Sequence, residues 1–235
     1  MDIIKKELRK VAGAERVKNL QKYFRTGIGQ YGEGDVFIGV SVPELRRIAR
    51  KHWDRILLGD VEKLFMSEIH EERLVGILIL VEKFASQEDR EEIYNFYLKN
   101  LKGVNNWDLV DLSAPKIVGE FLLDGNRSVL DELASSENLW ERRIAIVSTF
   151  AFIRVGEFDD ALRIGKVLLK DKHDLIHKAV GWMLREVGKR DEEVLKKFLR
   201  ENYSDLPRIT LRYAIERFGE EERKKWMRGD YLIFL

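Results

Sequence analysis

The chain contains no cysteine, and this absence excludes three kinds of chemistry. Without thiols the protein has no disulfide bond, no thiolate nucleophile and no cysteine-based zinc site. It also has only three prolines, no low-complexity linker and no apolar run longer than that from Leu74 to Val81, which is too short to cross a bilayer. The charged beginning lacks the apolar core of a signal peptide. We therefore expect an uninterrupted chain in the cytoplasm, without membrane association.

The chain also lacks an excess of charge of either sign. Its 42 lysines and arginines balance 41 aspartates and glutamates, which leaves a formal net charge of +1. No global basic field indicates a nucleic-acid partner, although basic residues gathered on one face can still form a local patch. Hydrophobic residues make up 45% of the chain, which predicts a globular protein with a large core rather than a disordered one.

What the sequence does contain is a repeat. The same local pattern recurs every 35 residues, and apolar residues follow each occurrence, at Arg73, Asp108, Arg143, Lys178 and Tyr213. A fixed period of this size is typical of solenoids built from two helices per unit. We therefore predict an all-α fold: an α-solenoid of HEAT-like helical repeats with a concave groove, which forms a single domain over residues 1–235.

Helical periodicity dominates, and the alternation typical of strands is never sustained. The repeat-marked helices are apolar nearly all round, so we expect them to form a buried inner layer beneath amphipathic partners. The predicted helices span residues 2–12, 14–25, 42–53, 60–66, 70–85, 88–101, 106–123, 126–135, 138–154, 157–169, 173–189, 191–201, 206–218 and 220–227. The apolar end, residues 231–235, is expected to dock on the last repeat.

Four candidate functional residues fall near the same phase of this repeat: Trp107, Asp111, Arg143 and Trp182. Their offsets span roughly 140° of one helix face, so stacked repeats should bring them to one concave surface. Each of these residues could instead have a purely structural role, because tryptophans are more often core residues and isolated charged residues usually lie in solvent. In that interpretation Asp108 caps the helix and Asp111 is a solvated acid. A polar side chain on a buried helix costs free energy unless it finds a partner or a groove.

The segment from Thr26 to Val40 is the exception to this regularity, because it holds five glycines. Its residues 27–32 match the G-x-G-x-x-G pattern of dinucleotide sites. Such a site needs a strand before the motif and a helix directly after it, whereas here a helix precedes and the next helix begins some residues later. Two other hypotheses stay open for the Gly27–Gly39 loop: a flexible or packed surface loop, and a loop whose backbone approaches a ligand.

His173 and His177 lie four residues apart and resemble the metal-binding helix of zinc metalloproteases. An aspartate replaces the glutamate of that motif and no third ligand is evident, so we predict no metal site and place both histidines at a helix entry. Arg46, Lys178 and Arg185 belong to a series of basic residues near helix ends and on the repeat faces. These residues form either solvated faces or contacts with phosphate groups.

With these residues in view, the chain resembles the DNA alkylation repair family of HEAT-like-repeat DNA glycosylases, the AlkD-like proteins. The resemblance covers nearly the whole chain. The matching segments are residues 23–25, 32–35, 39–46, 106–111, 140–143 and 178–186, which include the sequences Asn-Trp-Asp-Leu-Val-Asp and Lys-Ala-Val-Gly-Trp-Met-Leu-Arg-Glu.

The resemblance implies a monofunctional glycosylase that excises cationic N3- and N7-alkylated purines from double-stranded DNA by hydrolysis of the N-glycosidic bond, in base excision repair. It implies that Asp111 is the catalytic carboxylate, that Trp107 and Trp182 line the lesion, that Arg143 grips a phosphate and that Tyr23 is an auxiliary wall. No cofactor, metal or obligate protein partner is required, and the protein would be associated with the nucleoid.

The rival hypothesis is a non-catalytic HEAT-like solenoid that binds DNA or protein, because such arrays are common interaction scaffolds. A Schiff-base step through Lys178 is also open, although nothing in the sequence argues for it. The shared repeat phase of the two tryptophans, the aspartate and the arginine favours the enzyme. We expect Lys178, Arg185 and Arg46 to contribute to DNA binding.

Overall fold

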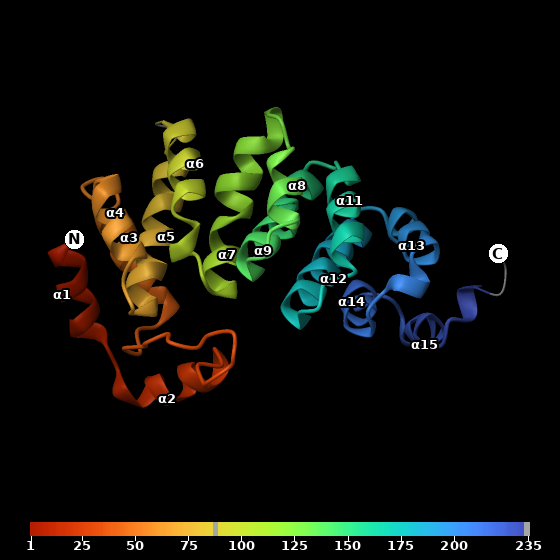
Figure 1. Ribbon diagram of the computed structural model, residues 1–235, viewed down its shortest axis with the longest axis horizontal. Helices are drawn as coiled ribbons and strands as arrows, with labels where there is room; N and C mark the ends of the chain where they lie inside the picture. The colour runs from red at the N-terminus through yellow and green to blue at the C-terminus, as the bar shows by residue number, and fades with distance from the viewer. Residues whose placement is uncertain (87–88, 233–235) are drawn as a thin grey trace. The chain divides into compact units, whose positions relative to one another are not determined.

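The computed structural model describes residues 1–86 and 89–232, and over these residues the protein is helical (Figure 1). No β-strand forms within the described residues, and one isolated parallel bridge joins Val36 to Ile69. The predicted all-α fold is confirmed. No helix of the described residues is long and apolar enough to traverse a bilayer.

The chain divides into two compact units, Met1–Ile117 and Val118–Leu235. That residues 1–235 act as a single domain with one groove stays a prediction. The helices of the first unit are α1 (Asp2–Val11), α2 (Ala14–Tyr23), α3 (Val42–His52), α4 (Leu58–Phe65), α5 (His70–Ala85), α6 (Arg90–Lys99) and α7 (Trp107–Ser113). Those of the second are α8 (Val129–Ala134), α9 (Leu139–Ser148), α10 (Phe150–Arg154), α11 (Asp159–Leu168), α12 (Asp174–Gly188), α13 (Glu192–Glu201), α14 (Arg208–Ala214) and α15 (Glu220–Arg228).

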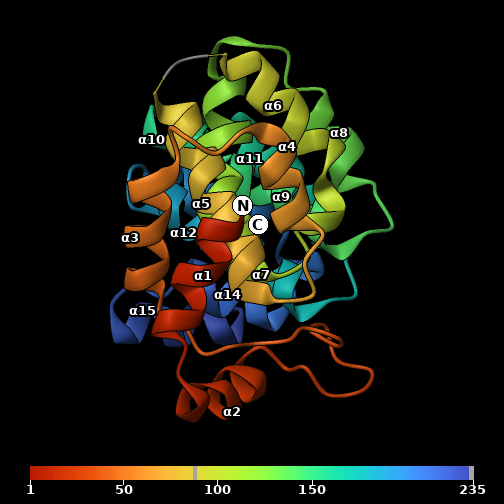
Figure 2. The same cartoon turned by 90° about the vertical axis from the view of Figure 1, so that its left-hand side faces the viewer.

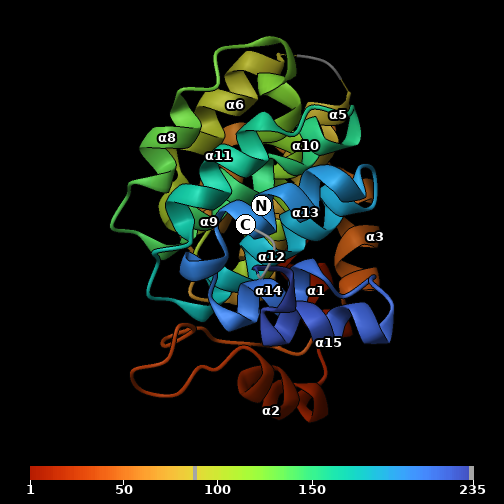
Figure 3. The same ribbon diagram turned by 90° about the vertical axis from the view of Figure 1, so that its right-hand side faces the viewer.

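The repeat-marked positions lie on helices α5, α7, α9, α12 and α14. In the first unit α5 packs between α3 and α7, and every residue from His70 to Val81 is buried. In the second unit α12 packs against α9 and α14, with α11 and α13 beside it (Figure 3). Each buried leucine or isoleucine of these helices stabilises the fold by about 1.5–3 kcal/mol relative to exposure, which is why the apolar run of α5 predicted its burial correctly.

Two long predicted helices are broken in the structure. The helix predicted over 106–123 ends at Ser113, because Pro115 has no N–H to continue it, and a π-helical turn (Pro115–Gly119) and a 3-10 turn (Leu122–Asp124) follow. The helix predicted over 138–154 is interrupted at Thr149, whose hydroxyl donates back to the Ile146 carbonyl at 2.6 Å.

The predicted start of the helix over 88–101 lies outside the described residues, and α6 is described from Arg90. Of the apolar end predicted to dock on the last repeat, residues 233–235 also lie outside the described residues. Tyr231 itself stacks on Trp226, with ring centroids 4.4 Å apart.

The glycine-rich segment connects α2 to α3 and, with α2, lies at one edge of the first unit (Figure 2). A helix precedes it and no strand does, which argues against a dinucleotide site. Residues 27–30 are exposed, whereas the end of the segment is packed. A Cβ atom on Gly39 would stand 2.1 Å from the Gly13 carbonyl oxygen, and Gly39 has φ +81°, so only glycine fits.

Candidate functional site

Trp107 begins helix α7, and its backbone is fixed by the residue before it. The buried Asn106 is the N-cap: its side-chain oxygen accepts from the Trp107 N–H at 2.9 Å. The amide of Asn106 donates to Asp35 of the glycine-rich segment at 2.8 Å. Asp108, the cap considered from sequence, instead accepts from its own following N–H, of Leu109, at 2.9 Å. The start of α7 is therefore tied to the glycine-rich segment by a buried polar contact.

The Trp107 ring is held by aromatic neighbours. It stacks on Phe24 with ring centroids 5.2 Å apart and planes inclined by 13°, and Tyr23 meets it edge-on at 5.6 Å. Tyr23 is 65% exposed, whereas Trp107 is half-buried. Tyr31 forms a side-chain hydrogen bond with Trp107, and its hydroxyl donates to the Tyr23 carbonyl at 3.3 Å. The structure thus brings together two residues proposed from the sequence, Tyr23 and Trp107, as an aromatic surface open to solvent.

Beneath this surface lies a buried cluster of charged side chains that the sequence analysis missed. His70 of α5 lies between two carboxylates, with Nδ1 3.1 Å from Asp35 and Nε2 2.9 Å from Asp108. Arg73 donates to the other Asp35 oxygen at 2.5 Å. Burial alone would lower the pKa of His70, but its hydrogen bonds to Asp108 and Asp35 outweigh it and raise that pKa to about 9. Burial would likewise raise the pKa of Asp35, and its bonds to His70 and Arg73 lower it instead.

A second anchor holds the glycine-rich segment from the same helix. The buried carboxylate of Glu71 accepts from three successive backbone N–H groups, of Ile38, Gly39 and Val40, at 3.1, 2.8 and 3.2 Å. Charge-assisted bonds of this kind are the stronger ones in proteins. The first turn of α5 therefore supports the segment at residues 35–40 with both a carboxylate and a cluster of charges.

Asp111 lies on α7 four residues after Trp107, and it is half-buried. Residues at this spacing share one helix face, with Cβ atoms about 6 Å apart. Its charge also reaches Tyr97 of α6, whose pKa is raised first by complete burial and further by Asp111. The Tyr97 hydroxyl is paired with Ser113 at 2.8 Å, so it is held by the fold and is not available as an acid.

In the second unit, Arg143 and Trp182 lie on neighbouring helices α9 and α12. Arg143 is only 5% exposed and donates to the Leu175 carbonyl at 2.6 Å, so it is not the exposed arginine that the sequence left as an alternative. Trp182 is half-buried and lies 6.2 Å from Phe150 between ring centroids. Whether these two residues join Trp107 and Asp111 at one surface stays a prediction.

The basic residues proposed for DNA binding differ in their surroundings. Lys178 is half-buried on α12, one turn before Trp182. Arg185, further along α12, forms an ion pair with Glu216 and lies 3.8 Å from Glu186. Arg46 of α3 is half-buried. Burial lowers the pKa of Lys116, and the nearby charge of Arg46 lowers it further, whereas the charge of Glu82 opposes the shift.

His173 and His177 have structural roles, as the sequence indicated. His173 caps α12, where its Nδ1 accepts from the Leu175 N–H at 3.1 Å, and His177 contacts the Asp171 carbonyl at 2.7 Å. In the described part of the chain no group of three or more metal-ligating side chains comes together.

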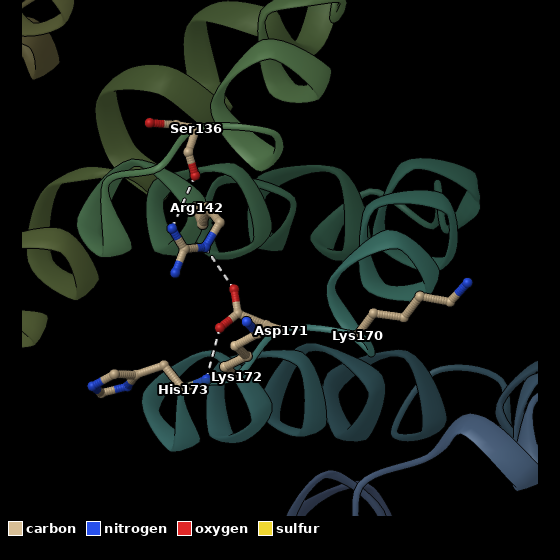
Figure 4. Close-up of a pocket in the computed structure, with 6 residues that line it drawn as sticks. All are labelled: Ser136, Arg142, Lys170, Asp171, Lys172 and His173. Atoms are coloured by element: carbon tan, nitrogen blue, oxygen red, sulfur yellow. Dashed lines mark hydrogen bonds and ion pairs between the residues drawn. The ribbon is translucent and has the colours of Figure 1, made fainter.

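Beside His173 is a small pocket, lined by Ser136, Arg142, Lys170, Asp171, Lys172 and His173 (Figure 4). Arg142 is engaged there by Asp171 at 2.5 Å and by the Ser136 carbonyl at 2.9 Å. The hydrogen bonds of Arg142 therefore connect the starts of α9 and α12, and its guanidinium is already engaged within the protein.

Comparison with known proteins gives two findings. The family model described as DNA alkylation repair enzyme matches residues 4–218. A solved structure titled "Predicted DNA alkylation repair enzyme from Enterococcus faecalis" is similar, with a TM-score of 0.73, 19% identity, and coverage of 89% of this chain and 97% of that one. At that identity the likeness shows the fold alone. No curated protein matches this sequence.

Proposed function

Because the chain belongs to the DNA alkylation repair enzyme family, we propose that it is a monofunctional DNA glycosylase for alkylated duplex DNA. It hydrolyses the N-glycosidic bond of purines made cationic by alkylation at N3 or N7. The observation that carries the proposal is in the first unit. A half-buried carboxylate, Asp111, lies one helical turn from Trp107, whose ring is fixed by stacking and edge contacts beside the exposed Tyr23.

The chemistry requires little more than this. A purine alkylated on a ring nitrogen is positively charged and leaves readily, and the sugar gains oxocarbenium character as the bond breaks. A carboxylate held about 4 Å from that cation stabilises it by about 4 kcal/mol at an effective dielectric constant near 20. That energy corresponds to roughly a thousandfold in rate. Asp111 also orients the attacking water.

Trp107 supplies the second attraction. The face of an indole ring attracts a cation by about 0.5–2 kcal/mol, and more when water is excluded. The ring is already immobilised by Phe24 and Tyr23, so it loses little freedom when the substrate binds. The alkylated base or the sugar cation is therefore favoured over a neutral nucleotide, which gives selectivity for damage without reading the sequence.

The second unit supplies the remaining proposed contacts apart from Arg46, which lies on α3 of the first unit. Trp182 is a second aromatic partner for the lesion, and Arg143 binds a phosphate beside it. Lys178, Arg185 and Arg46 bind phosphates further along the duplex, so affinity should fall steeply as salt rises. Arg185 exchanges its carboxylate partner Glu216 for a phosphate in that role. No metal or organic cofactor enters the mechanism.

The experiment that tests the proposal is release of methylated bases from N-methylated duplex DNA by the purified protein. Asp111→Asn keeps the size of the side chain and removes its charge, so it should lose excision and keep DNA binding. Glu91→Gln, which removes an exposed carboxylate of α6, is the matched control and should excise normally. DNA binding without release by the unaltered protein would instead support the non-catalytic DNA-binding solenoid.

A further inference from the structure

His70 has an arrangement that defines its protonation state. The side chain is 2% exposed, and each of its two ring nitrogens faces a carboxylate oxygen, of Asp35 at 3.1 Å and of Asp108 at 2.9 Å. An ionised carboxylate only accepts hydrogen bonds, so each nitrogen must donate. Both nitrogens then carry a proton, and the ring is an imidazolium cation.

The groups around this cation balance it. The two carboxylates face the imidazolium of His70 and the guanidinium of Arg73, which donates to Asp35. Tyr31 lies near Asp108, whose charge adds to the effect of burial in raising the pKa of Tyr31. The buried set therefore holds two positive and two negative charges, and removal of one charge leaves a buried carboxylate without its full set of partners.

The aromatic neighbours extend from this cation to the site. The centroid of Phe37 lies 4.7 Å from that of His70, and Phe24 lies 4.9 Å from His70 on one side and 5.2 Å from Trp107 on the other. Both phenyl rings favour a positive charge at His70. Phe24 is thus a direct packing link between the imidazolium and the indole.

Two polar routes lead to the same residue. Asp108, bonded to Nε2 of His70, directly follows Trp107 in the first turn of α7. Asp35, bonded to Nδ1, accepts from Asn106, which directly precedes Trp107 and caps the helix. The residues on both sides of Trp107 are therefore fixed by one histidine.

We infer that His70 is a positioning residue for Trp107: its doubly protonated ring ties the glycine-rich segment to the first turn of α7 and so fixes the aromatic surface of the site. A neutral ring can donate to only one carboxylate, so its formation frees either the Asp35 side or the Asp108 side. The use of that surface in base excision rests on the proposed function, whereas the tie itself does not.

The first test measures the unaltered protein, and variants serve only to assign its resonances. In protein carrying ¹⁵N-labelled histidine and tryptophan, one histidine should show two protonated ring nitrogens from pH 6 to pH 8.5 and lose a proton near pH 9. The Trp107 indole resonance should move over the same pH range. A His70 ring that is neutral at pH 7.5, or an indole resonance that ignores its titration, would overturn the inference. His70→Gln and Trp107→Phe assign the two resonances.

The second test separates positioning from a general loss of packing. His70→Gln should reduce the rate constant for base release by one to two orders of magnitude with a smaller change in KM, because a displaced positioning group is costly in the transition state. His52→Gln is the matched control: His52 is also buried and lies 3.0 Å from a carboxylate, Glu7, but contacts nothing in the site. Equal effects of the two variants on the rate and on the Trp107 resonance would contradict the inference.

A third variant should shift the pH at which His70 titrates while the imidazole ring stays in place. Asp108→Asn keeps an oxygen that accepts from Nε2 and removes one negative charge, so the pH at which the Trp107 resonance moves should fall. An unchanged midpoint would contradict the role of Asp108. If the unaltered protein releases no base, the proposed function fails, and the two resonance measurements still decide whether His70 positions Trp107.

Discussion

Deprotonation of His70 should destabilise the protein by a predictable amount. The pKa of this histidine rises from the ordinary 6.5 to about 9 in the folded protein, although burial opposes the rise. A group whose pKa is raised by folding stabilises the native state fully below pH 6.5, and this contribution is lost as the pH rises through about 9. At about 1.4 kcal/mol for each pH unit, the contribution amounts to about 3 kcal/mol.

The assay is urea unfolding followed by far-ultraviolet circular dichroism at pH values from 6 to 10. The unaltered protein should be more stable than His70→Gln at pH 6, and the two free energies of unfolding should approach each other by about 3 kcal/mol at pH 10. Other groups that titrate in this range affect both proteins alike, so the difference isolates His70. Parallel curves, with a constant difference from pH 6 to pH 10, would refute the reasoning.

Two further predictions concern the packing around the site. Phe24→Ala removes the ring between His70 and Trp107, which should lower the free energy of unfolding by about 3–4 kcal/mol. It should also shift the Trp107 fluorescence, isolated by subtracting the spectrum of a Trp107→Phe variant, to longer wavelength. Unchanged Trp107 emission would count against the packing link through Phe24. Gly39→Ala places a Cβ atom on the Gly13 carbonyl oxygen and should lower the melting temperature, whereas Gly59→Ala, which meets no atom within 4 Å, should not; equal melting temperatures would show that the segment is not packed as described.

Most of the helical layout follows from local sequence. Helix α5 was predicted over 70–85 and has these bounds. Its long apolar run indicates a helix that is buried on both sides. The continuous helix predicted over 106–123 is α-helical only to Ser113, and π-helical and 3-10 turns follow Pro115, which was visible in the sequence. The repeat pattern outweighed a local rule there: a proline inside a helical pattern ends or kinks the helix before it.

The buried charges illustrate what the sequence did not reveal. Asp35 and His70 are 35 residues apart, and Asp35 lies in a segment without periodicity, so nothing local pairs them. One pattern could have suggested the cluster: the sequence His-Glu-Glu-Arg begins a helix that is otherwise apolar and was expected to be buried. Polar side chains on such a helix need partners, and this holds for His70 and Arg73 as it does for Asp111 and Arg143.

The sequence likewise predicted only part of the surroundings of the candidate functional residues. The contact between Tyr23 and Trp107 is present in the structure, yet the stacking of Phe24 that fixes the indole was not foreseen, because Phe24 lies before the repeat series, which begins at Arg73. The family resemblance is confirmed by the match over residues 4–218. The roles of Asp111, Arg143 and Trp182 stay predictions, because they depend on where a bound duplex lies.

The most direct test of the central claim is identification of the products from a duplex that contains a single 7-methylguanine. The account predicts free 7-methylguanine and an abasic site in equal amounts, without strand cleavage, and neither product with Asp111→Asn. A 7-methylguanine that stays in the strand, or that loses its methyl group while still attached to the sugar, would contradict the account.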